Sequence, residues 1–298
     1  MTFSVEFDAA MIPHAIRHYH DVLGLRKDQF LVVLHHSQRN AVELQEMVEV
    51  LHAQDIRHVH TWSGNFTSQA NCNQRWKQRQ GIVKDECDWV LKFDADELLR
   101  VPNNDMKTFL QFLGIQGFDS LSASWMDRVA AEGKLLNISS TDTAPLEEQF
   151  PLACQFSANA GANATTRKVV AFRGYLREKR AGHSLERKSA LQTCRYPAQL
   201  ILDHYKWSWP VVEKLRRRLA HYKQLDSTWW WKESETFLNH IDSNGGRIDV
   251  ANPEYQCYED NSRDANRPMI HSLFDIEDGV AESTPCQRQV RQCPNLLI

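Results

Sequence analysis

The chain has 298 residues, of which 42% are hydrophobic, so it is long enough to bury the core of one large α/β domain. Its formal net charge of -3, with no extended Lys/Arg tract, provides no general attraction for nucleic acid, which excludes nucleic acid as the expected partner. No window approaches the roughly 18 apolar residues that span a bilayer, and residues 1–8 lack the basic-then-apolar order of a signal peptide. We therefore expect no transmembrane segment in this chain.

Strand and helix patterns alternate through the first hundred residues. Apolar runs predict strands, and apolar residues at helical spacing predict helices. In chain order the expected elements are a strand at 2–7, a helix at 12–23, a strand at 30–34, a helix near 44–51, a strand at 58–62, a helix at 68–84 and a strand at 88–93. Short connections between such elements predict a mostly parallel central sheet flanked by helices, a Rossmann-like α/β fold. Ligands of such sheets bind beyond the carboxyl ends of the strands.

The regularity weakens after residue 100. The expected elements are a helix at 106–113, a strand at 120–125, a loop-rich region at 127–166, a strand at 168–172, a short apolar run at 200–202 and a helix that begins at Pro210. The chain beyond about residue 238 reads as irregular. We expect a main domain at residues 1–225 and a helical or irregular C-terminal extension, packed on it, at 226–298.

Cysteine usage leaves the compartment open. Seven cysteines occur without a Cys-x-x-Cys pair, which argues against structural zinc, and their odd number implies at least one free thiol. Cys286 and Cys293 would close a short disulfide in an oxidising compartment. Asn-x-Ser/Thr triplets begin at Asn65, Asn137 and Asn163 and would be glycosylated only in a secretory lumen. We expect a cytoplasmic location, with the Golgi lumen as the alternative if the chain is a fragment that lacks its anchor.

The expected strand at 88–93 ends in three carboxylates, Asp94, Asp96 and Glu97. Carboxylates so close together repel one another and are costly to desolvate unless a cation lies between them. Hard Mg²⁺ or Mn²⁺ prefers oxygen ligands and bridges to phosphates, so Asp-x-Asp at a strand end predicts a metal-bound, diphosphate-bearing substrate. The alternative is that Asp96 or Glu97 only caps a following helix.

The motifs together resemble the glycosyltransferase family 2 type of sugar-nucleotide transferase with a GT-A fold, over about residues 3–224. The most specific part is the block at 88–99. The supporting parts, in chain order, are Glu6, the segment 64–80 with Gln69, Asn71 and Cys72, the run 125–130 followed by Gly133, then 148–151, 167–170, Gly182-His183 and 203–208. About 70 C-terminal residues match no family pattern.

This resemblance implies a metal-dependent inverting glycosyltransferase of the hexosyl- or deoxyhexosyltransferase class. It would move a sugar from a nucleotide-diphosphate donor to a glycan or another hydroxyl acceptor, with Mn²⁺ or Mg²⁺ on Asp94 and Asp96. Asp96 is the firmer ligand, and Glu97 would orient its neighbours. The residues implied to contact the donor nucleotide are Glu6, Gln69, Asn73 and Asp94.

Four further residues are candidates for the chemistry. His204 follows a short strand and precedes a helix, where GT-A enzymes commonly supply a third metal ligand; His183 is its competitor. An inverting transfer also needs a base for the acceptor hydroxyl. Asp127 is the first choice and Glu148 the second, although Asp127 beside Arg128 is equally well read as an ion pair.

Two other functions fit parts of the sequence. A haloacid-dehalogenase-type phosphatase also uses Asp-x-Asp at a strand end, but there the motif lies on the first strand and continues with Thr or Val rather than Glu97. A non-catalytic domain of the same fold would bind a sugar nucleotide or glycan without turnover.

Overall fold

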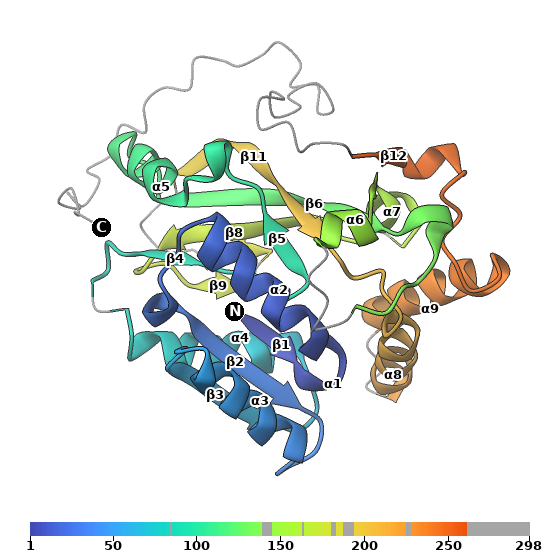
Figure 1. Cartoon of the computed structure of the whole chain (residues 1–298), viewed down its shortest axis with the longest axis horizontal. Coiled ribbons are helices and arrows are strands. Elements are labelled where there is room, and N and C mark those ends of the chain that lie inside the picture. The colour runs from blue at the N-terminus through green and yellow to red at the C-terminus, as the bar shows by residue number, and fades with distance from the viewer. Residues whose placement is uncertain are drawn as a thin grey trace.

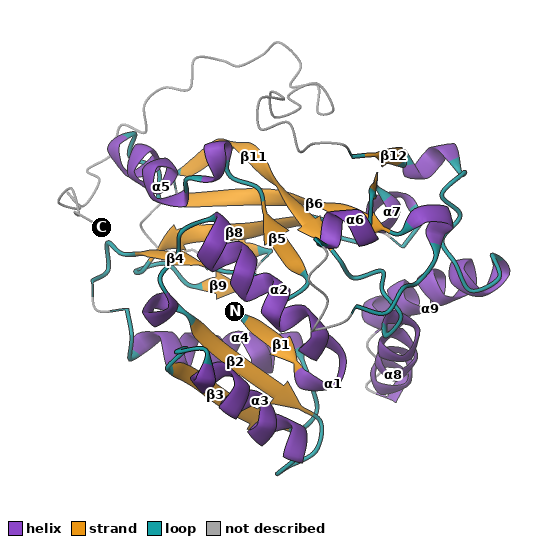
Figure 2. Cartoon of the chain, in the orientation of Figure 1, coloured by secondary structure: helices purple, strands orange, loops and turns teal. Residues whose placement is uncertain are grey.

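The computed structural model describes residues 1–83, 85–138, 145–162, 164–179, 183–186, 194–224 and 228–260. This part of the chain folds into two main sheets with helices packed on them (Figures 1 and 2). The strands are β1 (Thr2–Ser4), β2 (Leu31–His36), β3 (His58–Ser63), β4 (Trp89–Leu91), β5 (Glu97–Leu99), β6 (Ser120–Val129), β7 (Leu152–Cys154), β8 (Arg167–Arg173), β9 (Glu178–Lys179), β10 (Ser184–Leu185), β11 (Arg195–His204) and β12 (Tyr258–Glu259). The helices are α1 (Val5–Asp8), α2 (Ile12–Arg17), α3 (Val42–Ala53), α4 (Ser68–Gln80), α5 (Met106–Ile115), α6 (Leu146–Gln149), α7 (Phe156–Asn159), α8 (Val211–Gln224) and α9 (Thr228–Ser243).

The prediction of a mostly parallel central sheet is wrong for the larger sheet. Strands β1, β2 and β3 form a parallel sheet of three, as the βαβ pattern indicated. In the described part of the chain the other main sheet has seven strands, and among their pairs only β6–β11 is parallel. The mixed α/β class is thus confirmed, whereas the proportion of parallel pairing is lower than expected.

The carboxylate-bearing strand shows why the prediction failed. A parallel neighbour requires a crossover of about a dozen residues or more. Strand β4 is instead followed within a few residues by the turn at 94–96 and by β5, so no helical crossover fits between them. Strand β4 pairs with β8 and β5 pairs with β11, both antiparallel, in the seven-stranded sheet.

Most of the other expected elements are present with shifted ends. The strand expected at 2–7 is shorter, because the chain turns into α1 at Val5. Pro13 lies in the first turn of α2, where its missing N–H breaks no intrahelical bond. The loop-rich region begins later than expected, since β6 continues to Val129. Among the described residues, no helix combines the length and the apolar character that a membrane crossing requires.

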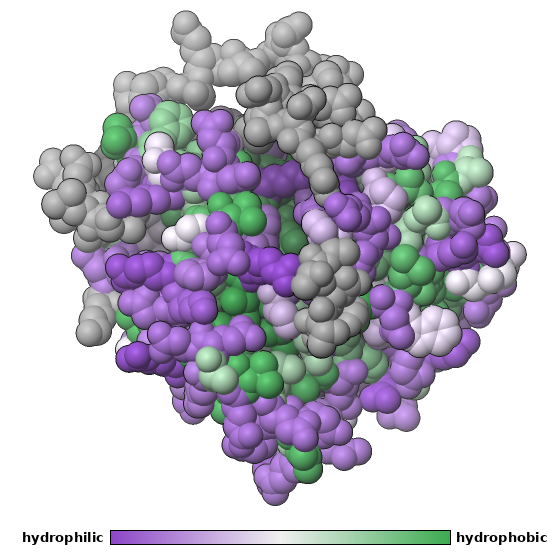
Figure 3. Space-filling view, in the orientation of Figure 1, coloured by the Kyte–Doolittle hydropathy of each residue, from purple (hydrophilic) through white to green (hydrophobic). Residues whose placement is uncertain are grey.

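One hydrophobic core joins the two main sheets. Side chains of β2, such as Val32 and Leu34, pack with Leu121 of β6 and Leu202 of β11 in a single cluster. The face seen in Figure 3 is mostly hydrophilic, and hydrophobic residues show on it in separate patches. The core therefore fixes the ends of β2 and β11 relative to each other, and these ends carry much of the site described below.

Residues 228–260 are more regular than expected and belong to a second core. Helix α9 packs on α8, and Phe237 and Ile241 of α9 join a cluster with Phe156 and Trp207. Strand β12 pairs with β7 at the edge of the large sheet. The boundary at residue 225 stays a prediction, while the segment beyond 260, including Cys286 and Cys293, lies outside the described residues.

A disulfide between Cys154 and Cys257 fastens this second core to β7. It closes a loop of 103 residues, and losing such a bond typically costs about 2–5 kcal/mol of folding free energy. We expect Cys154→Ser/Cys257→Ser to unfold at a clearly lower denaturant concentration than the oxidised parent chain. Cys72 is a free, buried thiol, in agreement with the odd cysteine count. Equal unfolding midpoints for the double variant and the parent would show that this bond does not support the fold.

Candidate functional site

A cavity of about 460 Å³ lies where the small parallel sheet, the turn at 94–97, the end of β11 and helix α8 meet. Its volume falls within the range of about 300–1,000 Å³ that small-molecule sites occupy. Four predicted site residues line it: Glu6, Asp94, Asp96 and His204. The cavity wall contains none of the other four, which are Gln69, Asn73, Asp127 and Glu148.

Pairing within the large sheet brings three polar side chains together. His204, at the end of β11, is the register partner of Asp127 on β6 and of Glu97 on β5. Register partners lie side by side on the same face of a sheet. Asp96 joins them from the preceding turn, where its backbone oxygen accepts a hydrogen bond from the Tyr205 N–H at 2.8 Å.

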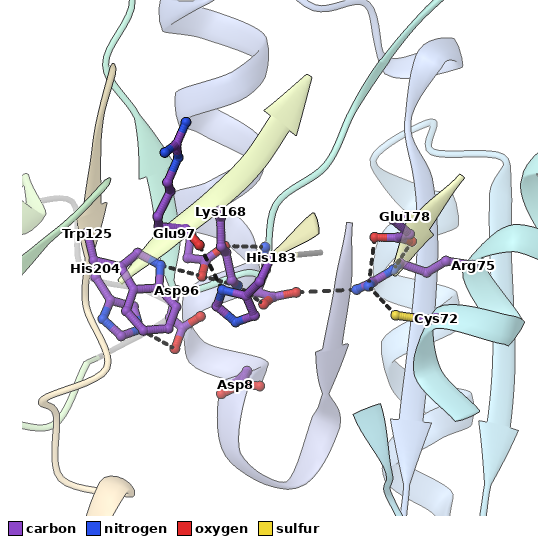
Figure 4. A network of polar contacts seen from close by, with 12 residues as sticks. Asp8, Cys72, Arg75, Asp96, Glu97, Trp125, Lys168, Glu178, His183 and His204 are labelled. Carbon is purple, nitrogen blue, oxygen red and sulfur yellow. Dashed lines mark hydrogen bonds and ion pairs between the residues drawn. The ribbon is translucent and has the colours of Figure 1, made fainter. Parts of the chain in front are cut away.

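The imidazole of His204 is fixed by its neighbours. Its Nδ1 lies 2.9 Å from Asp127 Oδ1, and since a carboxylate only accepts, Nδ1–H is the donor. Its ring also stacks on Trp125, with centroids 4.3 Å apart. The remaining nitrogen, Nε2, lies 3.9 Å from Asp96 Oδ2 (Figure 4). A histidine held by a carboxylate with its other nitrogen directed at an oxygen ligand is the usual arrangement around a bound metal.

The donor set fits a divalent cation. Ligand atoms of Asp96, Glu97 and His204 all lie within 4.8 Å of one another. The 3.9 Å between His204 Nε2 and Asp96 Oδ2 is less than twice a metal–ligand bond of about 2.1 Å, so one ion can contact both atoms. His183 lines the same cavity but lies outside this group, and its Nδ1 donates to the Arg167 carbonyl at 2.8 Å. The geometry therefore favours His204 over His183.

Glu97 lies beside Asp96 and His204 and is held in place by three hydrogen bonds. It is almost fully buried, and it accepts hydrogen bonds from Trp125 Nε1 at 2.9 Å, from the Asp94 N–H at 3.1 Å and from the Lys168 ammonium. Trp125 thus holds Glu97 through its indole N–H and His204 through its ring face. With its oxygens already accepting these bonds, Glu97 is suited to orienting its neighbours.

Asp94 takes a different position from the one expected for a metal ligand. Its carboxylate accepts a hydrogen bond from Lys168 Nζ at 2.5 Å and lies 3.6 Å from Arg75 Nη1. Burial alone would raise the pKa of Asp94, but the positive charges of Lys168, Lys92 and Arg75 outweigh it and hold that pKa well below its usual range. These protein cations already neutralise Asp94, so the structure places it as the partner of Lys168 and Arg75, and its role as a metal ligand stays a prediction.

Asp127, the first choice for the base, is enclosed within the large sheet. Its side chain is 2% exposed, and its oxygens accept from His204, from the Ser157 N–H at 2.5 Å and from Ser157 Oγ at 2.7 Å. Burial would raise the pKa of Asp127, yet the hydrogen bonds from His204 and Ser157 lower it. Asp127 does not pair with Arg128, which instead contacts Asp260. The structure places this carboxylate against His204, and its role as a base stays a prediction.

Glu148 does not reach the cavity. It is an exposed residue of the short helix α6 and is absent from the cavity wall. The carboxylates that do line the cavity, besides those of the 94–97 turn, are Glu6, Asp8 and Glu233. Burial raises the pKa of Asp8, against the opposing effect of Lys214.

The expected nucleotide contacts separate into two places. Glu6 lies on the cavity wall, where it accepts from the Ser37 N–H and hydroxyl at 3.1 and 2.7 Å. Gln69 and Asn73 face outward on α4 and bond to each other at 3.0 Å. Asn71, on the same helix, does line the cavity. Helix α4 therefore faces the cavity with Asn71, and not with Gln69 or Asn73.

Three buried polar atoms on this wall lack partners among the described residues: Ser4 Oγ, His35 Nδ1 and Asn71 Oδ1. Since His35 Nε2 donates to the Gly64 carbonyl at 2.8 Å, its Nδ1 is an acceptor. Trp62 and Phe66 flank the His35 ring at 4.3 and 5.2 Å. Buried polar groups are nearly always hydrogen-bonded, so these atoms have hydrogen-bonding capacity that the described residues leave unused.

No protein-family model matches the chain, and no curated protein matches it either. Among solved structures, a crystal structure of residues 1–349 of S. aureus TarS resembles it with a TM-score of 0.32 and 12% sequence identity. The match covers 82% of this chain and 74% of that chain. A score this low carries no functional inference, and we therefore argue the function from the site itself.

Proposed function

We propose that the protein is a metal-dependent, inverting glycosyltransferase of the hexosyl or deoxyhexosyl class that uses a nucleotide-diphosphate sugar. The observation that carries this proposal is the pairing of Asp96 with a carboxylate-oriented His204 on the wall of a ligand-sized cavity. Asp96 and His204 would hold Mn²⁺ or Mg²⁺, with Glu97 and Asp127 as the groups that orient them. A divalent cation bound there would stabilise the negative charge of the departing diphosphate.

The rest of the cavity suits the remaining parts of such a substrate. The unpartnered atoms of Ser4, His35 and Asn71, beside the rings of Trp62 and Phe66, would bind the base of the donor nucleotide. Glu6 would meet the same nucleotide at the end of β1. A glycan or another hydroxyl acceptor would then enter from the side of α8 and α9.

We also propose that the protein works in an oxidising compartment. The Cys154–Cys257 disulfide supports this, because such bonds persist mainly outside the reducing cytosol. It favours the lumenal alternative over the cytoplasmic location expected from the sequence.

A thermal-shift screen of nucleotide sugars with Mn²⁺ tests the proposed function. A donor that binds only the folded state raises the melting temperature. We expect a shift that needs both the sugar nucleotide and Mn²⁺, followed by slow release of nucleoside diphosphate. Binding without release would indicate a non-catalytic domain, and metal-dependent hydrolysis of p-nitrophenyl phosphate would indicate a phosphatase.

Asp127→Asn should weaken Mn²⁺ binding by about 10–100-fold, the usual effect of losing an orienting partner. Ser157 N–H and His204 Nδ1–H both need an acceptor from residue 127, and an amide offers one oxygen. An amide N–H directed at His204 would force the imidazole into the tautomer whose Nε2 is protonated and cannot ligate. Isothermal titration of Mn²⁺ measures the change.

Glu148→Gln is the matched control, because Glu148 lies outside the cavity wall. We expect its Mn²⁺ affinity to equal that of the parent chain. An unchanged affinity in Asp127→Asn would remove Asp127 from the support of the metal site.

A further inference from the structure

The cavity wall carries equal numbers of acidic and basic side chains, but not every basic side chain has an acidic partner among the described residues. Six carboxylates and six Lys or Arg side chains line the cavity. Lys214 pairs with Asp8 at 2.8 Å, and Arg218 contacts Glu233 at 3.3 Å. Arg217 reaches Glu6, while Arg75 and Lys168 meet Asp94. Lys206 is the remaining cation, and no carboxylate of the described residues forms an ion pair with it.

The chain direction places Lys206 beside the candidate metal site. Side chains alternate between the two sides of an extended chain. Residues His204 and Lys206 are two apart in the sequence, and both line the cavity. Even a fully extended chain separates residues two apart by only about 6.6–6.8 Å, so Lys206 lies close to His204 along the cavity wall.

Aromatic rings, rather than carboxylates, hold the ammonium of Lys206. Its Nζ lies 4.6 Å from the centre of the Trp207 ring and 4.5 Å from that of Phe237. Such cation–π contacts position a charge without neutralising it. The ammonium therefore keeps its donors for a ligand, and a half-buried cation facing a cavity attracts an anionic one.

We propose that Lys206 binds a phosphate oxygen of the diphosphate that the neighbouring metal site holds. This inference rests on the proposed function. It adds the ammonium of Lys206 as a second positive charge, besides the metal ion, that contacts the diphosphate. A diphosphate carries more negative charge than one divalent cation neutralises, and a lysine at its far end supplies the difference as a point charge. The acidic side chains that already occupy Lys214, Arg217 and Arg218 leave Lys206 as the cation for this task.

Calorimetric titration of the full chain with inorganic pyrophosphate, in excess Mg²⁺ and again in EDTA, tests the proposal. We expect Lys206→Met to weaken pyrophosphate binding in Mg²⁺ by about 10–100-fold, the range of one charge-assisted hydrogen bond. Methionine retains the apolar contact with Trp207 and Phe237. If Lys206→Met does not melt cooperatively, Lys206→Gln is titrated in its place. Lys134→Met, an exposed lysine, is the matched control and should bind as the parent does.

The outcomes separate the two proposals. Equal pyrophosphate affinity in Lys206→Met and the parent overturns the role of Lys206 and leaves the metal site standing. Unchanged pyrophosphate binding together with weakened binding of glucuronate would also overturn it, and would assign Lys206 to an acidic sugar. A parent chain that binds no pyrophosphate even in Mg²⁺ contradicts the proposed function and this inference together.

Discussion

Asp96→Asn is expected to lower sugar-nucleotide turnover by about 10²–10³-fold, the usual effect of removing one group that stabilises developing charge. Asp96 supplies the carboxylate oxygen opposite His204 Nε2, and an amide oxygen carries no charge to hold the cation. The fold should survive, because the side chain lies in a turn and stays partly exposed. Release of nucleoside diphosphate in Mn²⁺, together with a thermal melt, measures both effects.

Asp94→Asn provides the comparison for this experiment. The two substitutions are chemically identical and two residues apart, but Asp94 contacts Lys168 and Arg75. We expect it to retain the Mn²⁺ affinity of the parent chain. Equal losses of Mn²⁺ affinity in both variants would restore the symmetric Asp-x-Asp metal site that the sequence suggested.

Lys168→Met is expected to destabilise the fold by about 3–5 kcal/mol, the cost of removing one partner from a buried ion pair. Lys168 is buried on β8, and its ammonium bonds to Glu97 and Asp94 while lying 5.2 Å from the centre of the Trp125 ring. The variant leaves Glu97 buried without its cation. Urea unfolding at pH 7 measures the loss, and Lys107→Met, on the exposed face of α5, should change stability by less than about 0.5 kcal/mol.

The stability difference between Lys168→Met and the parent chain should depend on pH, and the lowered pKa of Asp94 sets the direction of this dependence. Lys168 helps to hold the pKa of Asp94 below its unfolded value, so that carboxylate stabilises the parent above the unfolded pKa and loses this contribution as pH falls through the folded pKa. In Lys168→Met the pKa of Asp94 rises toward or above its unfolded value, and protonation relieves the lost pairing. The stability gap between the two chains should therefore narrow as pH falls from 7 toward 3. A constant gap would show that Lys168 contributes by packing alone.

The sequence predicts local elements of this protein better than their pairing. Apolar periodicity located β2, β3, α3 and the segment that ends at Asp94. It did not predict that β4 pairs antiparallel with β8, because pairing depends on which distant strand is adjacent. The close succession of β4 and β5 was the available signal, since it excludes a helical crossover.

The candidate site shows the same difference between local sequence patterns and contacts that depend on strand pairing. Local motifs pointed to Asp96 and His204 as candidates, and the sheet register shows neighbours of these residues that no motif contained. Trp125 and Asp127 are two residues apart on β6, so they share a face, and Lys168 joins that face as the register partner of Ala123. A lysine at the start of an apolar strand is a signal of a buried ion pair, but its partners become visible only once strands are paired.

Asp127 shows how the contacts of a predicted site residue can differ from those that its sequence position suggested. Its position after the strand at 120–125 suggested a base facing an acceptor loop. In the structure β6 continues through Asp127, which turns the carboxylate toward His204 and Ser157 inside the sheet. Burial and hydrogen bonding, which the sequence does not encode locally, set these contacts.

Pulsed electron paramagnetic resonance of Mn²⁺ bound to the full chain with a nucleoside diphosphate tests the central claim most directly. The account predicts nitrogen coupling from an imidazole ligand and phosphorus coupling from the diphosphate. The nitrogen coupling should vanish in His204→Ala and persist in His183→Ala. Absence of nitrogen coupling in the parent chain, or its loss in His183→Ala alone, would contradict the assignment of the metal site to Asp96 and His204.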